Sequence, residues 1–570
     1  MNQPFACVAE RPAAPASPVA VTLADALVDV FTRIGVCHAF GVSGGGIAVL
    51  WAALTRSPIR VCHFRHEAGA AFAATEAHFA SGAPVVVFTT AGPGLTNALT
   101  GLLAARSDGA KVILVSACTS EEKRGRWAIQ ETSRATMPAQ LYEAGALFHM
   151  ATIIESAADL PGIARALADG VARPGGFVAH IALPTGLQAS RCDKPPRLHA
   201  SSRVCDESAQ LAADVAPLLA ATPFAIWLGF GARGAAAAVR ALAEHTGAPV
   251  FCSPRGKGIF PEDHAQFVGV TGIGGHDAPA HFMRTHKPGR VLVLGTRLGE
   301  GTSFWDPAMV PAQGFIHVDI DPAVPGSAYP NAPTLAICAD IDTFAKALLE
   351  RMPSRRPQAS RDQWPHPSLA DDGEQHAGRV RPEALMAAIQ RGVIDKHDAL
   401  VLAESGNSFA WATHHLQFRE PGRYRVSTRC GAMGHCAAGV VGSALATGRK
   451  AVAIVGDGAM LMNNEINTAV QFGARAVWIV LNDARYNMCH QGMAALGMCA
   501  DASIPKVDFA LMARAMGASG VRVSCEAELA PALAAAMTAT GPYLIDVDID
   551  PDRVAPTLAR NRGLRAEGTA

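Results

Sequence analysis

One stretch of the chain, residues 452–488, restricts the fold more than any other. An apolar strand over 452–455 ends in Gly-Asp-Gly, centred on Asp457; a helical stretch follows, and a second apolar strand over 477–481 ends in Asn-Asp, at Asp483. Parallel strands joined by a helix place their carboxyl ends side by side, where open α/β sheets bind ligands. We therefore expect both aspartates at one sheet edge, where two carboxylates and close-approaching glycines suit a hard cation that carries a diphosphate.

The same stretch resembles the diphosphate-binding signature of thiamine diphosphate (ThDP) enzymes. The resemblance implies that Asp457, Asp483 and the backbone carbonyl of Arg485 bind Mg²⁺. The pair reads Asn-Asp where Asn-Asn is usual, and the segment is one residue shorter than in acetolactate synthases, but an aspartate is a sound Mg²⁺ ligand. The alternative is an ordinary strand–helix–strand unit whose Gly-Asp-Gly only turns the chain. The residues implied to bind the cofactor here are Gly456, Asp457, Gly458, Ala459, Asp483 and Met488.

A second part of the resemblance lies far upstream, in residues 61–117. The order of strands and helices there, with the motifs Arg-His-Glu, Gly-Pro-Gly and Thr-Asn, resembles the pyrimidine-binding domain of acetolactate synthase-like ThDP enzymes. The resemblance implies that Glu67 is catalytic and that Glu67, Pro93 and Asn97 contact the cofactor. Gln130, in an Ile-Gln-Glu that resembles the family's Phe-Gln-Glu, is expected to reach the reacting centre. Taken alone, a glutamate at a strand-to-helix junction is more often a helix N-terminal charge.

The chemistry of the cofactor explains why a carboxylate is needed beside its pyrimidine ring. The thiazolium C2 proton is too weak an acid to leave unaided at neutral pH. A carboxylate hydrogen-bonded to N1′ of the pyrimidine favours the imino tautomer, whose exocyclic nitrogen takes that proton. In the family an apolar side chain keeps the cofactor bent, and the resemblance of residues 427–446 to the family's Gly-Thr-Met-Gly segment makes Met433 that side chain. Plain core filling is the alternative for a methionine.

Further candidate residues follow other strands. Gly406, Asn407 and Ser408 come at a strand end, where backbone amides and short polar side chains suit diphosphate oxygens, although a simple helix cap has the same pattern. Two histidines, His435 and His490, are candidate proton carriers near the cofactor. A lone histidine is more often part of the structure than of the chemistry.

Composition excludes several classes of function. The chain has 570 residues, enough for three or four domains. Its 49 basic and 49 acidic residues give a net charge of zero, and without a basic block nothing supports binding to nucleic acid or to an anionic membrane. The 13 cysteines form no Cys-x-x-Cys pair, so we expect free thiols in a reducing cytoplasm. No stretch reaches transmembrane length without glycine, proline or charge.

Shifts in sequence texture divide the chain into parts. Alternating strand and helix patterns fill three long stretches, which polar, proline-containing segments separate. The resemblance implies an α/β fold of three doubly wound parallel-sheet domains. The expected parts are a disordered leader (1–20), a pyrimidine-binding domain (21–190), a central Rossmann-like domain (209–350), a linker (351–378), a diphosphate-binding domain (379–552) and a tail (553–570).

The central domain carries a glycine-rich turn, residues 229–234, that fits Gly-x-Gly-x-x-Gly after a strand and before a helix. Such a turn suits a dinucleotide phosphate, but the same glycines serve any tight strand-to-helix turn. Acetolactate synthases bind FAD in this domain, whereas many relatives bind ADP or nothing. Because residues 295–303 depart from the FAD-binding stretch of those synthases, the sequence leaves FAD open.

Two departures from acetolactate synthases concern the substrate. The arginine that holds the acceptor carboxylate in those enzymes corresponds to Gly301, so a charge-assisted contact is lost. The tryptophan that narrows their acceptor site corresponds to Gly492, which leaves space. We infer an acceptor bulkier than pyruvate, such as an aromatic 2-oxo acid or an aldehyde. The side chains that would instead fill this space are Tyr486, Asn487 and His490.

The function implied by the resemblance is that of a decarboxylative carboligase, which joins an acyl unit from a 2-oxo acid to a second carbonyl with ThDP and Mg²⁺ as cofactors. The family forms its site between two subunits, so we expect a homodimer or homotetramer. The alternatives are a 2-oxo acid decarboxylase, acetolactate synthase proper, a flavin-dependent 2-oxo acid oxidase and, less favoured, a non-catalytic ThDP-fold binding protein. We expect small-molecule substrates, a cytoplasmic location, and no nucleic-acid or membrane partner.

Overall fold

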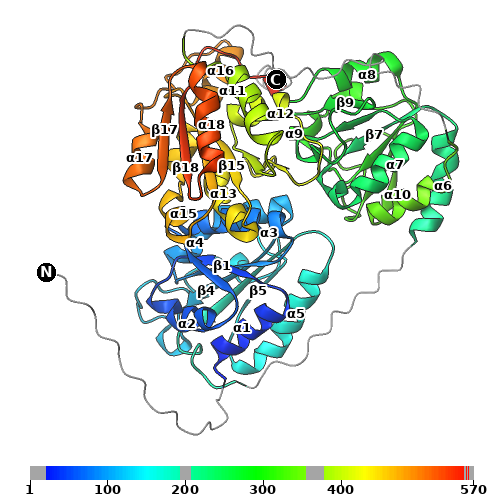
Figure 1. Ribbon diagram of the computed structural model, residues 1–570. Helices are drawn as coiled ribbons and strands as arrows, with labels where there is room; N and C mark the ends of the chain where they lie inside the picture. The colour runs from blue at the N-terminus through cyan, green and yellow to red at the C-terminus, as the bar shows by residue number, and fades with distance from the viewer. Residues whose placement is uncertain (1–20, 193–206, 355–377, 558–559, 562, 564–570) are drawn as a thin grey trace.

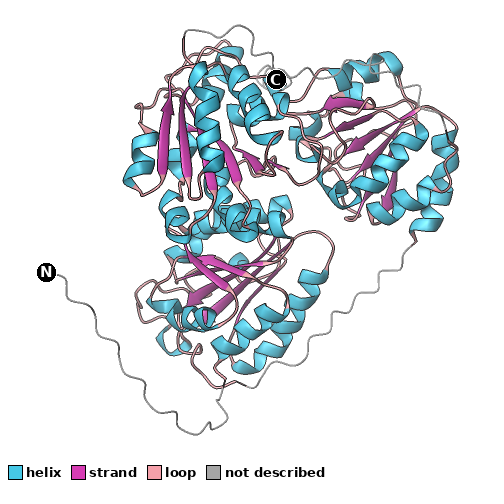
Figure 2. Cartoon of the chain, in the orientation of Figure 1, coloured by secondary structure: helices cyan, strands magenta, loops and turns pink. Residues whose placement is uncertain are grey.

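Three parallel six-stranded sheets organise the chain (Figure 1). The computed structural model describes residues 21–192, 207–354, 378–557, 560, 561 and 563. Helices cover both faces of each sheet, as Figure 2 shows, which confirms the predicted α/β class. The expected leader, and most of the expected linkers and tail, lie outside the described residues. The units built on the three sheets are called here the first, central and third domains.

The first domain has the strand order β2-β1-β3-β4-β6-β5. Its inner strand β3 is buried along its whole length and is apolar up to its last residue, Thr89, because a strand covered by helices on both faces buries every side chain. Its strands are β1 (His38–Gly41), β2 (Arg60–His63), β3 (Val85–Thr89), β4 (Lys111–Cys118), β5 (Met150–Ile153) and β6 (Phe177–Pro184). Its helices are α1 (Leu23–Arg33), α2 (Ala48–Arg56), α3 (Glu67–Ser81), α4 (Pro93–Asp108) and α5 (Leu160–Ala172).

The central domain has a different strand order, β12-β11-β10-β7-β8-β9. Its strands are β7 (Phe224–Leu228), β8 (Val250–Cys252), β9 (Phe267–Val270), β10 (Arg290–Leu294), β11 (Phe315–Asp319) and β12 (Thr334–Cys338). Its helices are α6 (Ser208–Ala220), α7 (Ala236–Thr246), α8 (Ala278–His286), α9 (Glu300–Ser303) and α10 (Ile341–Leu349). The sheet order changes direction between β10 and β7, the place where open sheets of this kind receive a ligand.

The third domain has the order β14-β13-β15-β16-β18-β17. Its strands are β13 (Leu400–Ala403), β14 (Tyr424–Arg425), β15 (Ala451–Gly456), β16 (Ala476–Asn482), β17 (Ser519–Val523) and β18 (Tyr543–Asp548). Its helices are α11 (Pro382–Ile389), α12 (Asn407–His415), α13 (His435–Thr447), α14 (Asp457–Met462), α15 (Ile466–Phe472), α16 (Asn487–Ala495), α17 (Phe509–Ala515) and α18 (Leu529–Thr538). The two strands predicted around the Gly-Asp-Gly turn are β15 and β16, which pair in parallel as expected.

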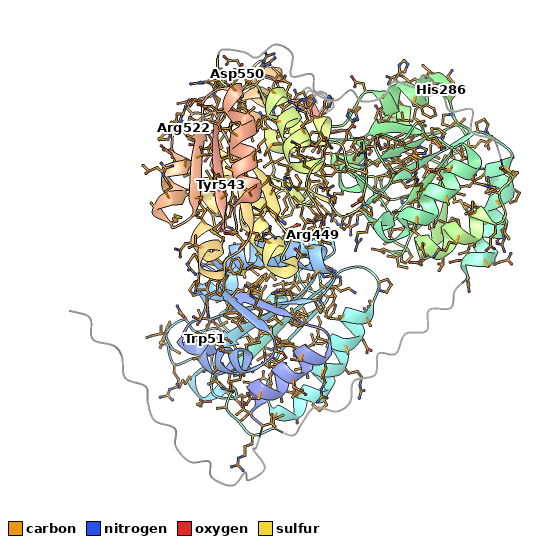
Figure 3. The ribbon with its side chains drawn as sticks, in the orientation of Figure 1. Trp51, His286, Arg449, Arg522, Tyr543 and Asp550 are labelled. Carbon is orange, nitrogen blue, oxygen red and sulfur yellow. The ribbon has the colours of Figure 1, made fainter. Side chains whose placement is uncertain are left out.

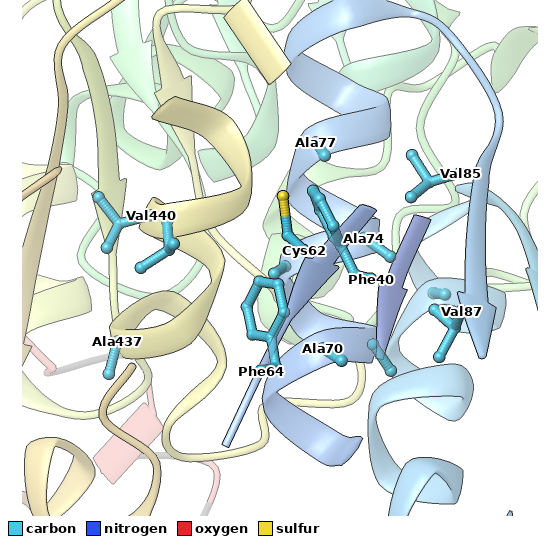
Figure 4. Close-up of a cluster of buried hydrophobic side chains, with 14 of the residues drawn as sticks. Phe40, Cys62, Phe64, Ala70, Ala74, Ala77, Val85, Val87, Ala437 and Val440 are labelled. Carbon is cyan, nitrogen blue, oxygen red and sulfur yellow. The ribbon is translucent and has the colours of Figure 1, made fainter. Parts of the chain in front are cut away.

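The first and third domains share one hydrophobic core. Helix α3 packs against α13, and small side chains let the two backbones approach closely. At Gly442 a Cβ atom would lie 2.0 Å from the carbonyl oxygen of Ala73, so only glycine fits this crossing. Figure 4 shows Phe64 and Val440 among the side chains of this core, one from each domain. The two outer domains therefore form one packed unit in each chain.

The carboxyl edge of the third sheet points away from the first domain. In Figure 3, Asp550 lies just past the end of β18, at the end of the third domain remote from the first, and Tyr543 marks the other end of the strand. Because the strands of the sheet are parallel, the segments that leave β13, β15 and β16 lie toward the same remote edge. Among the described helices, none is both long and apolar enough to cross a membrane.

Candidate cofactor site

A cavity of about 260 Å³ opens at the carboxyl edge of the third sheet. The segments that follow β13, β15 and β16 form most of its wall. The described residues that line it all fall between Pro382 and Arg560, in the third domain and the segment after it. The predicted site residues among them are Gly406, Asn407, Ser408, Met433, Gly456, Asp457, Gly458, Ala459, Asp483, Arg485 and Met488.

Asp457 and Asp483 lie together in this cavity, at the ends of adjacent strands. The Asp457 carboxylate accepts the Gly458 N–H at 2.6 Å and the Ala484 N–H at 2.7 Å, so it ties the end of β15 to the end of β16. Burial raises the pKa of Asp483 to about 6, and the charge of Asp457 adds to this; burial also raises the pKa of Asp457. Two carboxylates that are close together and removed from water repel each other when both are charged. A divalent cation that binds oxygen ligands would offset this repulsion.

Amide oxygens in the same cavity lack a partner. The Asn487 amide donates to Asp483 at 2.7 Å and to the Pro551 carbonyl at 2.9 Å, but its own Oδ1 is buried without a hydrogen bond. The Oδ1 of Asn407 is likewise buried without a hydrogen bond. A buried acceptor left unpaired costs about 1–3 kcal/mol, so both atoms favour a bound ligand or cation. These residues fit a Mg²⁺–diphosphate group.

The segment that leaves β13 serves both as a helix start and as a cavity wall. Gly406 has φ 121°, a conformation that favours glycine, and Asn407 begins α12. The Ser408 hydroxyl donates back to the Glu404 carbonyl at 2.9 Å. The turn therefore both starts a helix and lines the cavity, so the two interpretations of it, a diphosphate-binding loop and a helix cap, do not exclude each other.

Met433 reaches the cavity from a segment shaped by glycines. Gly431 and Gly434 both have positive φ, 60° and 85°, and Gly434 immediately precedes α13. A Cβ atom placed on Gly458 would lie 3.4 Å from the terminal methyl group of Met433, so the two residues are neighbours. A side chain at Gly458 would also come within 2.6 Å of the Tyr486 ring, so this glycine lets Tyr486 cover the turn.

Glu404 does not line the cavity but supports two segments that do, and the sequence analysis missed it. It is fully buried, and its carboxylate accepts the N–H groups of Ser405, Cys436 and Ala437 at 2.9, 2.8 and 3.1 Å. It therefore joins the segment after β13 to the first turn of α13, just beyond Met433. Burial raises the pKa of Glu404. The available signal was an acidic residue directly after a wholly apolar strand.

The other predicted residues gather at the carboxyl edge of the first sheet. Glu67 begins α3 and is 8% exposed, and its carboxylate accepts the Asn97 side-chain N–H at 3.1 Å. Pro93, Asn97 and Gln130 are exposed. Gln130 packs beside Gly92, where a Cβ would lie 3.0 Å from the Cβ of Gln130. The structure thus collects Glu67, its amide partner and Gln130 at one edge.

One chain does not bring the two groups of predicted residues together. The cavity wall contains no described residue of the first domain, and the edge that carries it points away from that domain (Figure 3). Glu67 and Asp457 therefore lie at two separate sheet edges, one in each outer domain of the chain.

The two candidate histidines lie outside the cavity wall. His435 is buried, with Nε2 2.9 Å from Glu76, whose carboxylate also receives two hydrogen bonds from Arg425. Burial acts to lower the pKa of His435, but the adjacent Glu76 outweighs it and the pKa is raised. Glu76, Asp108 and His435 have the spacing of a metal site, yet the Arg425 guanidinium fills this cluster, which makes it an ion-pair network.

The positions expected to enlarge the acceptor site are away from the cavity of one chain. Gly492 is buried within α16 and does not line the cavity. Of the side chains that would fill its space, Asn487 is bonded to Asp483 and Tyr486 covers Gly458. A Cβ at Gly301, in α9, would lie 3.3 Å from the Thr428 carbonyl, so this glycine faces the segment that leads to Met433.

Comparison with known proteins gives three family models that together cover most of the chain. They describe the N-terminal TPP binding domain (residues 21–137), the central domain (212–348) and the C-terminal TPP binding domain (404–547) of thiamine pyrophosphate enzymes. The chain is 28% identical to an acetolactate synthase of Mycobacterium bovis, over 89% of this chain and 84% of that protein. It is 27% identical to acetolactate synthase 1 of Zea mays, over 92% and 85%. It is 26% identical to acetolactate synthase 1 of Oryza sativa, over 92% and 84%.

Proposed function

This chain belongs to the thiamine pyrophosphate (thiamine diphosphate) enzyme family, and we propose that it is a decarboxylative carboligase acting on a 2-oxo acid and a second carbonyl compound. The observation that carries the proposal is the pair of adjacent carboxylates, the buried Asp457 and the half-buried Asp483, beside unpaired amide oxygens in one cavity. The reaction releases CO₂ from the donor and forms a carbon–carbon bond to the acceptor carbonyl, whose oxygen takes up a proton. Decarboxylation alone would use the same residues.

Each predicted residue has a role in this proposal. Asp457, Asp483 and the Arg485 carbonyl hold Mg²⁺, and the turns after β13 and β15 hold the diphosphate. Met433 supports the bent cofactor, and Glu67 holds a proton at pyrimidine N1′ with Asn97 as its hydrogen-bond partner. When bound, ThDP supplies a nucleophilic carbon and an electron sink for the loss of CO₂. The residues implied to contact the cofactor from the first domain are Glu67, Pro93 and Asn97, with Gln130 beside the substrate.

We propose that two copies of the chain complete each site. Among the described residues, the wall of the third-domain cavity includes none from the first domain, and the edge around Glu67 lies apart from the two aspartates. Each half offers what the other lacks, and a closed two-fold dimer satisfies both at once. A homodimer, or a tetramer built from it, is the expected assembly. Free thiols at the described cysteines agree with the proposed cytoplasmic location.

The proposed acceptor is bulkier than pyruvate, an aromatic 2-oxo acid or an aldehyde. Gly301 offers no cation to an acceptor carboxylate, although it faces the segment before Met433. Asn487 is hydrogen-bonded to Asp483, and the Tyr486 ring lies over Gly458, so both side chains already have a contact apart from Gly492. These observations support an enlarged acceptor site and do not favour acetolactate synthase proper.

The central-domain turn gives little support for a flavin. The Gly231 N–H donates to the Gly295 carbonyl at 2.9 Å, and the Ala232 N–H donates to the Gly229 carbonyl at 3.0 Å. Two amides that would face a dinucleotide phosphate are thus used within the protein. We therefore propose the non-oxidative reaction. Flavin colour in the purified protein, together with oxygen uptake on adding a 2-oxo acid, would instead establish the oxidase.

Calorimetry on metal-stripped protein tests the cofactor assignment. ThDP is expected to bind with Mg²⁺ and not with EDTA, and Asp457→Ala should abolish the metal-dependent part. Asp501→Ala, at an exposed carboxylate outside the cavity wall, is the matched control. A product screen by mass spectrometry with paired 2-oxo acids and aldehydes tests the reaction. Acetolactate as the sole product from every pair would exclude the enlarged acceptor.

Hybrid dimers test the shared site. Glu67→Gln and Asp457→Ala chains should each be inactive, because every site in either homodimer lacks one group. A hybrid contains one complete site, made of Glu67 from the Asp457→Ala chain and Asp457 from the Glu67→Gln chain. Co-expression should therefore restore roughly a quarter of wild-type activity for random pairing. Co-expressed chains that remain inactive, while shown to pair, would rule out the shared site.

A further inference from the structure

Two large apolar side chains stand almost free of the protein in the loop that follows β4. Trp127 is 97% exposed and Ile129 is 96% exposed, and both are close to Gln130 in the chain. Single exposed apolar residues are ordinary, but a fully exposed tryptophan beside a second apolar side chain marks a contact surface. The loop leaves the carboxyl edge of the first sheet, the edge that carries Glu67.

The backbone of this loop is held in an unusual shape. Trp127 has φ 57° and Gln130 has φ 53°, which bulky residues rarely adopt unless the surroundings impose it. The Gly125 N–H donates to the Glu131 carboxylate at 2.6 Å, and the Thr132 N–H donates to the Thr119 hydroxyl at 2.9 Å. These bonds close the base of the loop. The structure therefore presents Trp127 on a tied loop at a fixed place.

That place is next to Glu67. The Gly92 N–H donates to the Thr132 hydroxyl at 2.6 Å, which fastens the base of the loop to the Gly-Pro-Gly turn. A Cβ at Gly94, in the same turn, would lie 3.6 Å from the Glu67 carboxylate. Loop, turn and Glu67 are thus one continuous edge. A second chain that packs on this edge would therefore meet the base of the loop as well as Glu67.

We propose that Trp127, with Ile129, enters the cofactor cavity of a second copy of this chain and forms the apolar wall of its acceptor site. The inference rests on the proposed function, because it needs the shared site. The acceptor class that suits such a wall is a carbonyl compound with a planar aromatic ring, which packs on the indole face. Trp127 is then a specificity-determining residue supplied by the subunit that supplies Glu67.

The hybrid dimer separates this role from a general effect on folding. In one hybrid, Trp127→Ala is added to the Asp457→Ala chain, whose Glu67 belongs to the complete site. In the other hybrid, it is added to the Glu67→Gln chain, whose loop belongs to the inactive site. Pyruvate is the donor, and benzaldehyde and acetaldehyde are acceptors that differ in the ring. On the Asp457→Ala chain, the KM for benzaldehyde should rise about tenfold, with the KM for acetaldehyde little changed. With Trp127→Ala on the Glu67→Gln chain, the KM values for benzaldehyde and for acetaldehyde should both equal those of the hybrid that keeps Trp127.

Three controls make the outcome decisive. CO₂ release from pyruvate should stay within about twofold, since the donor step does not use the wall. Trp127→Phe should restore most of the benzaldehyde KM, because a ring remains. Trp305→Ala, at another exposed tryptophan with positive φ but in the central domain, should leave all constants unchanged.

The proposal is overturned if Trp127→Ala acts equally from either chain, if it leaves the ratio of the two KM values unchanged, or if sedimentation shows that it merely separates the dimer. An unsubstituted hybrid without activity would remove the shared site itself, and so the proposed function fails in a distinguishable way.

Discussion

The first and third domains of this chain have the same strand order and different chemistry. Numbered within each domain, both sheets run 2-1-3-4-6-5, whereas the central sheet runs 6-5-4-1-2-3. The segment after the second strand leads to Glu67 in one domain and to Met433 in the other. The turn after the third strand is Gly-Pro-Gly in one and Gly-Asp-Gly, with Asp457, in the other. A sheet edge thus fixes where loops stand, and a few side chains decide what each edge does.

The comparison also shows what the two edges cannot do alone. One edge offers a carboxylate with an amide partner and a tied apolar loop, and the other offers two neighbouring carboxylates in a cavity. The central domain uses its corresponding turn differently, since the amides after β7 bond to the protein itself. Turns that follow different strands of the three sheets therefore carry a carboxylate beside an amide, a pair of carboxylates in a cavity, and a turn closed by its own hydrogen bonds.

The largest effect is expected at Glu67, the feature that most separates the two edges. Glu67→Gln keeps an acceptor for Asn97 but removes the group that holds the proton, so kcat should fall by about 10²–10⁴-fold. ThDP affinity, measured by calorimetry, should change little because Asp457 and Asp483 are intact. Glu121→Gln, at an exposed glutamate of the same domain, is the control. A Glu67→Gln enzyme with wild-type kcat would contradict the assigned role.

The next effect concerns the bond between the two outer domains. Arg425 donates to both oxygens of Glu76 at 2.8 and 2.9 Å, and both side chains are almost fully buried. Arg425→Ala leaves a buried carboxylate with only His435, so unfolding free energy should fall by about 3–5 kcal/mol. Arg425→Lys keeps the charge but cannot make both hydrogen bonds, so its free energy of unfolding should lie between those of the wild type and Arg425→Ala. Denaturant titration measures both; equal stability of all three proteins would show that the pair is dispensable.

A pH effect is expected at Glu465, which joins the third domain to the segment before Glu67. Its carboxylate accepts the N–H groups of Arg65 and His66 at 3.0 and 3.2 Å, and burial raises its pKa from 4.5 to about 7. The folded state then holds a proton that the unfolded chain releases, so this contribution is complete below the unfolded pKa and is lost as the pH rises through about 7.

The measurement for Glu465 is the melting temperature as a function of pH. Relative to Glu465→Gln, which cannot ionise, the wild-type protein should lose stability between roughly pH 5 and pH 8. Glu420→Gln, at an exposed glutamate, should follow the wild-type curve. Parallel curves for wild type and Glu465→Gln would remove this explanation.

The smallest effect is expected between the third and central domains. Arg419 contacts Asp263 at 2.7 Å, but their side chains are 71% and 38% exposed. Exposed pairs contribute about 0–1 kcal/mol, so Arg419→Ala should change unfolding free energy by less than about 1 kcal/mol and lose even that in high salt. A loss comparable to that of Arg425→Ala would mean that the central domain is fastened by surface charge.

Sequence reasoning worked where the signal is local. The strand–turn–helix pattern around Asp457 and Asp483 predicted the α/β fold class and the proximity of the two aspartates. It could do so because the strands and turns that place them lie close together in the sequence. Glu404 was missed because its partners, at the start of α13, are distant in sequence. The pair of Glu76 and Arg425 was missed for the same reason. Roles for Glu67, Gln130 and Met433 remain predictions, to be decided by the variants above.

The glycine crossing between α3 and α13 has a consequence for the working enzyme. With Gly442 packed on the backbone of Ala73, this close crossing holds the outer domains of a chain in an arrangement that keeps Glu67 and Asp457 apart. A lone chain would then be folded yet inert, and turnover per chain would fall away on dilution.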